Sequence, residues 1–208
     1  MPPSDRRRRL AWLIAGRAIV VTVLLGSGLL VEINAPGRLP IGPFSTLVGL
    51  TYALTAVYAL AIRVAERRPW LVDVQLAIDA AVITALIAVS GGVTSYFSLL
   101  YVLPIIAAAT LQRGRGALAV AVLSSVLYAG VGVLQYQGPW PGAWLPAEPV
   151  TLPPPRAAFY AIAVNVFAFL AVAALARSLA ENLRRTGARL ERASKTIEDL
   201  QAFNQDVI

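Results

Sequence analysis

Two charged side chains inside long apolar stretches, Arg17 and Asp79, are the residues of this sequence best placed to do chemistry. Asp79 lies about nine residues into the stretch 70–89, roughly 13 Å at the rise of an α-helix, and Arg17 lies about seven residues, roughly 10 Å, into 10–31. An ionised group at such depth needs a partner or must be neutralised. The similar depths predict an Arg17–Asp79 contact. The alternatives are that Arg17 extends back towards polar surroundings and that Asp79 is a neutral acid bonded to a neighbouring helix.

The remaining composition excludes most catalytic chemistry. Cysteine and histidine are both absent, which removes thiolate metal ligands, the commonest general base and a phospho-accepting histidine. The chain has 208 residues, of which 58% are hydrophobic and 14% charged, whereas about a quarter of a soluble domain is charged. Because the apolar residues form long runs, the sequence predicts an integral membrane protein with lipid around it, no catalytic residues, no metal and no nucleic-acid partner.

Six apolar stretches approach the length of about 20 residues that a helix needs to cross a bilayer. They are 10–31, 41–62, 70–89, 96–111, 117–135 and 157–179. Arginines gather in every second connection, which places these connections and both termini in the cytoplasm by the positive-inside rule. These arginines are Arg6 to Arg9, then Arg63, Arg67 and Arg68, then Arg113 and Arg115, and finally Arg177, Arg184 and Arg185. The predicted fold class is an all-α integral membrane protein with six transmembrane helices.

The uncharged sequence SGGVTSYF, residues 90–97, forms the predicted outer turn between the third and fourth spans. Its two glycines permit the positive φ angles of a tight reversal. Hydroxyl groups and aromatic rings follow, and they predict a lateral site for an apolar membrane ligand or a partner helix. The simpler interpretation is a turn whose rings anchor it at the membrane surface. The predicted site consists of Gly91, Gly92, Ser95, Tyr96, Phe97, Tyr101 and Pro104, the last of which is expected to kink the fourth helix.

Further polar and aromatic residues of the spans and their connections favour structural roles. Trp140 and Trp144 lie in the proline-rich connection before the sixth span and suit a stiff loop on the bilayer surface. Hydrogen bonds between helices, rather than ligand binding, are expected of Ser124, Ser125, Tyr128 and Asn165.

The tail after the last span is polar but periodic. Apolar residues repeat every seven positions and again three positions later, which is the seam of a coiled coil. The seam consists of Leu183, Leu190, Ile197 and Asn204, with Thr186, Ala193, Leu200 and Val207, and most charged residues, Arg184 among them, are expected to face outward. Extended backward, the seam reaches Leu179 and Ala176, which predicts one rod from bilayer to cytoplasm and a homodimer. The alternative is a lone helix that packs on its own domain.

The expected organisation is a basic cytoplasmic N-terminus (1–9), a six-helix domain (10–179) and a coiled-coil linker (180–208). Within it, the sequence VQLAIDAAVITALIAVSGGVTSYFSLLYVLPIIAAATLQRGRGALAVAVLSSVLY resembles the membrane sensor region of bacterial sensor histidine kinases of the PilS/NtrB-like group. The segment ASKTIEDLQAFNQDVI resembles the linker that precedes the PAS domain of these proteins.

The resemblance implies a sensory and signal-transmitting module in the bacterial inner membrane. It implies that PAS and kinase domains follow in full-length members, that ATP and Mg²⁺ belong only to that kinase domain, and that a response regulator is reached through it. It also implies a transmembrane pilin as ligand, in the control of type IV pilus genes.

A second resemblance is to the RegB-like redox sensors, which also have six spans and a GG-x-x-N-P-F turn associated with quinone. Gly91, Gly92 and Phe97 match that turn, whereas Ser95 and Tyr96 stand in place of Asn and Pro. A quinone-sensing module is therefore a second candidate function. Two more candidates are a small permease-like transporter, against which the coiled tail counts, and an interaction scaffold without signalling output.

Overall fold

The structure, a computed structural model, describes residues 16, 19, 22, 23, 26, 41–67, 70–112, 115–137 and 152–206. All regular secondary structure in these residues is helical. The elements are α2 (Ile41–Arg67), α3 (Trp70–Val89), η1 (Gly92–Thr94), η2 (Tyr96–Tyr101), α4 (Val102–Leu111), α5 (Gly116–Gln137) and α6 (Pro155–Asp206). The predicted first span with Arg17, the outer connection with Trp140 and Trp144, residue Val207 and the side chains of Leu200 and Asn204 lie outside the described residues.

Three of the predicted spans are confirmed as helices long and apolar enough to cross a membrane. They are α3, α5 and the segment Pro155–Ser194 of α6. The apolar segments Ser45–Leu60 and Tyr96–Leu111 are helical but shorter. The described residues thus establish an all-helical membrane protein, and six crossings stay a prediction.

The short fourth span gains length from a change of helix type. Its first six residues form the 3₁₀-helix η2 and its last ten form α4. Because a 3₁₀-helix rises about 2.0 Å per residue, the segment spans about 27 Å instead of the 24 Å or so of a continuous α-helix. Pro104 lies in the first turn of α4, where its missing N–H leaves no helical acceptor unpaired. The change of helix type lies just before Pro104, and the kink expected at Pro104 stays a prediction.

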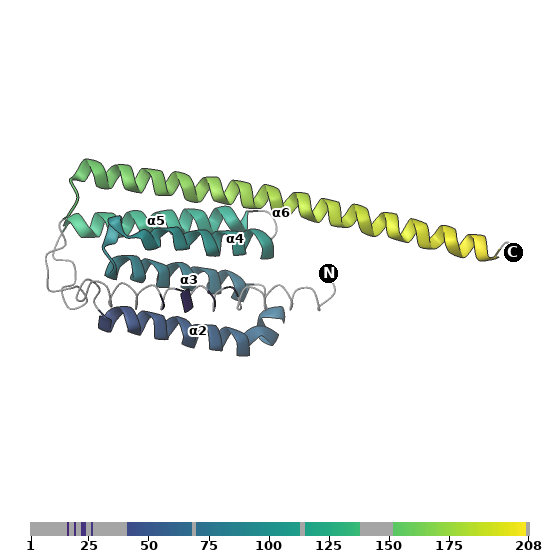
Figure 1. Cartoon of the computed structure of the whole chain (residues 1–208), viewed down its shortest axis with the longest axis horizontal. Helices are drawn as coiled ribbons and strands as arrows, with labels where there is room; N and C mark the ends of the chain where they lie inside the picture. The colour runs from purple at the N-terminus through teal and green to yellow at the C-terminus, as the bar shows by residue number, and fades with distance from the viewer. Residues whose placement is uncertain are drawn as a thin grey trace.

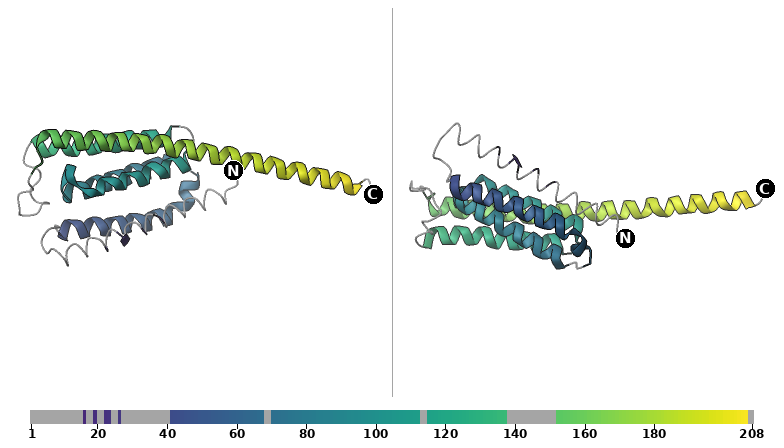
Figure 2. Two further views of the ribbon diagram at one scale, coloured as in Figure 1. Left: turned by 45° about the horizontal axis from the view of Figure 1, so that its top comes forward. Right: turned by 90° about the horizontal axis from the view of Figure 1, so that it is seen from below.

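The bundle is held together by α6, which packs along α4 and α5. The helix α3 packs against α5, and α2 packs against α3 (Figures 1 and 2). The centre of the bundle combines small and aromatic residues, and small residues let helices approach closely in lipid. Side chains with no exposed surface include Ala80, Ile87, Tyr101, Ile105, Ala108, Ala121 and Tyr128.

The predicted rod is present as one helix of 52 residues, about 78 Å long. Its first part lies in the bundle and its second part extends past the other helices (Figure 1). Ala176 packs against the bundle core, whereas Leu183, Leu190 and Ile197 are 65%, 67% and 56% exposed. The described part of the bundle therefore does not cover the apolar seam, contrary to the alternative of a helix that packs on its own domain.

Candidate functional site

The turn between α3 and η2, which we call the outer turn after its predicted side of the membrane, depends on its two glycines. Gly91 and Gly92 have φ angles of 124° and 64°, which are unfavourable for residues with a side chain. A Cβ on Gly92 would lie only 2.2 Å from Oε1 of Gln135. Ser95 then starts η2, because its hydroxyl accepts a hydrogen bond from the Phe97 N–H at 3.2 Å and shares another, of 2.6 Å, with the hydroxyl of Ser90.

The backbone of Val93 attaches this turn to α5. Its N–H donates to Oε1 of Gln135 at 3.0 Å, and its carbonyl accepts from the hydroxyl of Tyr128 at 2.8 Å. Asn165 of α6 in turn donates to the Tyr128 hydroxyl at 3.3 Å. Because buried backbone groups must find partners, these contacts fix the outer turn to two helices. The interhelical roles predicted for Tyr128 and Asn165 are thus confirmed.

The two serines of α5 do not form the predicted bonds between helices. Ser125 donates within its own helix, to the carbonyl of Ala121 at 2.7 Å. The Ser124 hydroxyl is buried and has no hydrogen-bond partner among the described residues. In lipid a serine can bond its own helix at the i−4 carbonyl, and this option satisfies Ser125 without a second helix.

Three aromatic rings form the core below the turn. Tyr101, Tyr128 and Phe169 meet edge to face, with ring centroids 5.2 to 6.5 Å apart, the arrangement that aromatic quadrupoles favour. The Tyr101 hydroxyl shares a hydrogen bond of 2.6 Å with the hydroxyl of Thr84 on α3. This cluster therefore connects α3, η2, α5 and α6 directly beneath the outer turn.

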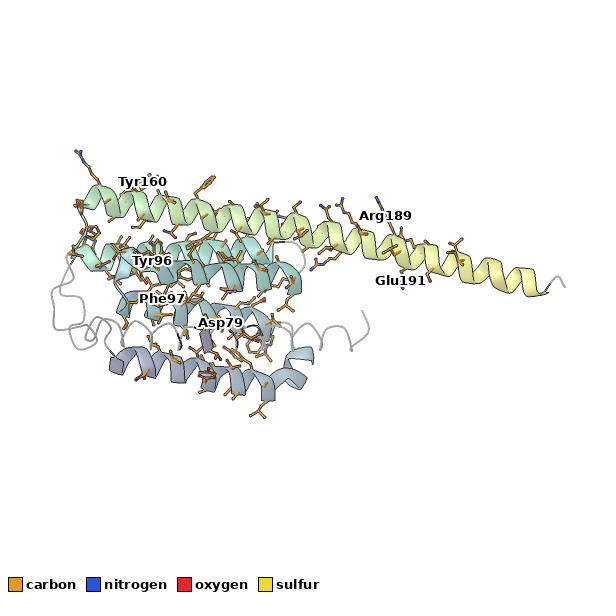
Figure 3. The ribbon with its side chains drawn as sticks, in the orientation of Figure 1. Asp79, Tyr96, Phe97, Tyr160, Arg189 and Glu191 are labelled. Atoms are coloured by element: carbon orange, nitrogen blue, oxygen red, sulfur yellow. The ribbon has the colours of Figure 1, made fainter. Side chains whose placement is uncertain are left out.

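The structure separates the aromatic residues that the sequence placed in one predicted site. Tyr96 is 91% exposed, Phe97 packs against Leu86 and Val48 of α3 and α2, and Tyr101 is 0% exposed in the core. Figure 3 shows Tyr96 and Phe97 at the same end of the bundle.

Four exposed side chains with helical spacing share one face of η2 and α4. We call this face the α4 stripe, and it consists of Tyr96, Leu99, Leu103 and Ile106. The spacing of a helix, applied to residues 96–111 of the sequence, would have placed these four residues on one face.

Asp79 is half-buried near the middle of α3 (Figure 3). Its predicted partner, Arg17, lies outside the described residues, so this pair stays a prediction.

Contacts at the opposite end of the bundle were not expected from the sequence. Gln112, just after α4, donates from its side chain to Asp73 at the start of α3. Arg184 of α6 donates to the carbonyls of Thr110 and Gln112 at 3.1 and 3.0 Å. The heptad pattern placed Arg184 off the coiled-coil seam, and it did not predict this contact with the bundle. Arg184 follows Ala176 and Ala180 at intervals of four residues, so the pitch of the helix carries it onto the side of α6 that faces the bundle.

The described residues contain no group of histidine, cysteine or acidic side chains that could hold a metal ion. What they offer instead is a chain of contacts from the outer turn, along η2 and α4, to the helix that leaves the bundle.

Comparison with protein families gives one match. A family model described as the PilS-like transmembrane domain matches residues 3–190. No curated protein and no solved structure matches the chain. The match includes the bundle, the outer turn and α6 as far as Leu190, which is most of the chain. By this match, the chain belongs to the family of PilS-like transmembrane domains.

Proposed function

We propose that this chain is the membrane sensor and signal-transmitting module of a bacterial two-component histidine kinase, located in the inner membrane with both termini in the cytoplasm. The observation that supports the proposal is the unbroken helix Pro155–Asp206, which begins at one end of the bundle and continues past the other (Figure 1). A helix without a break transmits displacement or rotation along its whole length. Family membership supports the same role.

The output of this module is a homodimeric coiled coil. Leu183, Leu190 and Ile197 repeat every seven residues and are all more than half exposed. Such a seam in water is stabilised when an identical helix covers it, and two chains inserted in one membrane present the seam at the same height. PAS and kinase domains joined to this coiled coil would receive the signal, bind ATP and Mg²⁺ and pass phosphate to a response regulator.

The input of this module is the α4 stripe. Tyr96 and Leu99 are 91% and 69% exposed, and Leu103 and Ile106 continue the same face towards the cytoplasm. The face is apolar, one helix wide and parallel to the spans, so it fits a transmembrane helix laid beside it. A pilin-type transmembrane segment, in control of type IV pili, is the partner that this geometry and the family favour.

Quinone sensing has less support from the contacts around the turn. The Ser95 hydroxyl is engaged by Ser90 and by the Phe97 N–H, and the Tyr101 hydroxyl is engaged by Thr84. A quinone carbonyl would have to compete with these bonds. No described feature favours a permease or a passive scaffold over the sensor.

The experiment that tests this proposal uses the chain joined to its PAS and kinase domains. Tyr96→Ala with Leu99→Ala removes two exposed side chains from the stripe, so folding is preserved and the response of autophosphorylation to a co-expressed pilin-type membrane segment should be lost. Val126→Ala with Leu134→Ala is the matched control, because these two α5 side chains are 64% and 61% exposed on another face. An unchanged response in the stripe variant, at a normal membrane level, would remove the stripe as the input.

A further inference from the structure

Arg184 lies at the point where α6 passes the C-terminal end of α4. Its Nη2 atom is 3.0, 3.1 and 3.4 Å from the carbonyl oxygens of Gln112, Thr110 and Ala109. The last carbonyls of an α-helix have no partner within the helix and carry the negative end of its dipole. A guanidinium group is a fitting cap for them, because its hydrogen bonds are assisted by a full positive charge. We call this contact the Arg184 clamp.

The clamp differs in kind from the rest of the contact between α4 and α6. Ala107, Ala108 and Ala173 are buried between these helices and their neighbours, and such apolar packing is non-directional. The neighbouring Arg185 makes only an exposed ion pair with Glu181, at 3.0 Å within α6, and such pairs contribute little. Arg184 therefore gives α6 a directional attachment to α4.

The other end of the same segment holds η2, whose helix type differs from that of α4. A 3₁₀-helix of six residues such as η2 is longer than the three or four residues that are common, and such stretches often mark hinges. Conversion of η2 to α-helix would shorten the segment by about 3 Å. Since the outer turn is fixed to α5 and α6 through Val93, the change would move the inner end of α4, where the clamp is.

We propose that Arg184 couples α4 to the signalling rod: a partner that docks on the α4 stripe shifts η2 and α4, and the Arg184 clamp transfers that shift to α6. This inference rests on the proposed sensor function for its biological meaning. Its structural part, that Arg184 sets the position of the rod relative to the bundle, stands independently and can be measured without a kinase.

The test uses the absence of cysteine from this chain. Cysteines introduced at Leu118 on α5 and Ala188 on the rod, both at exposed positions, are spin-labelled, and the chain is placed in lipid nanodiscs with an excess of unlabelled chain. Pulsed electron spin resonance then measures the distance within one chain. The parent protein and the control Arg185→Ala should give one narrow distance distribution.

Arg184→Ala should broaden or displace that distribution, because loss of charge-assisted bonds should raise the population of unclamped states on the order of tenfold. If Arg184→Ala does not insert, Arg184→Gln is compared with Arg185→Gln, since the amide keeps one nitrogen donor but loses the positive charge that strengthens the bonds to the carbonyls. A distribution identical to that of the matched control overturns the proposal. If the distribution broadens while stripe variants leave kinase output unchanged, the clamp stands and the proposed input fails.

Discussion

The hydroxyl of Tyr128 donates a hydrogen bond of 2.8 Å to the carbonyl of Val93, 35 residues earlier in the chain. This single bond joins the middle of α5 to the outer turn, and Asn165 extends it to α6. The turn that the sequence marks with two glycines is therefore a fixed part of the bundle. We therefore expect a change of conformation in η2, which follows the turn, and not in the turn itself.

The Tyr128 hydroxyl should contribute measurably to stability. Tyr128→Phe leaves the buried Val93 carbonyl without its partner, which should cost about 1–3 kcal/mol. Thermal unfolding in detergent, followed by circular dichroism, should show a Tm lower by about 2–4 °C for each kcal/mol. Tyr160→Phe is the control, because Tyr160 is 72% exposed, and it should leave the Tm unchanged. An equal Tm for Tyr128→Phe and Tyr160→Phe would mean that this hydrogen bond does not stabilise the turn.

The two kinds of glycine in the bundle should respond oppositely to a methyl group. Gly92→Ala forces a side chain into φ 64° and against Gln135, and should destabilise the fold by about 1–2 kcal/mol. Gly130→Ala meets open space within α5 and should stabilise it by about 0.5–1 kcal/mol. The same thermal measurement compares them, and the account of the turn fails if Gly92→Ala melts at or above the parent Tm.

Cysteine crosslinking should detect the coiled-coil seam. Single cysteines at Leu190 and Ile197, introduced into a chain without any cysteine, should form disulfide-linked dimers in membranes under mild oxidation. A cysteine at Arg192, which is exposed off the seam, should do so far less. Comparable crosslinking at all three positions would indicate random collision and not a heptad interface.

Reporter fusions should establish the number of crossings. Fusions after Arg68, Arg115 and Leu200 should report the cytoplasm, and fusions near Val93 and Glu148 should report the outside. The distribution of arginines predicts this result by the positive-inside rule. An outside signal after Arg115 would contradict the six-span topology.

The helices could be predicted from the sequence because hydropathy determines which segments enter the bilayer. The predicted span 70–89 coincides with α3, and 96–111 coincides with η2 and α4 together. The direction in which individual residues face was harder to predict. The change from 3₁₀ to α within one span separates Tyr96, Phe97 and Tyr101 into different surroundings, and only backbone geometry reveals it.

Arg184 shows the same limit in the tail. The heptad pattern identifies the face of the rod that an identical helix would cover, and it groups all other positions as outward. It does not show which of these outward positions meets the bundle near the membrane boundary. The positive-inside rule uses the charge of Arg184 to predict its side of the membrane, but the rule does not predict its partners.

The central claim is that α6 transmits a signal from the membrane as a continuous rod, and insertions into the rod test it most directly. In the protein joined to its kinase domains, one, two, three, four and seven residues with high helix propensity are inserted between Ser194 and Lys195, and autophosphorylation is measured with and without stimulus. Each added residue rotates the downstream part by about 100°, whereas seven restore the heptad phase to within about 20°. We predict that one to three residues, which leave the downstream part about 60° to 160° out of phase, fix the output high or low, and that four and seven residues, about 40° and 20° out of phase, keep a stimulus-dependent output. A response that declines steadily with insertion length, or that ignores it, would contradict transmission through α6.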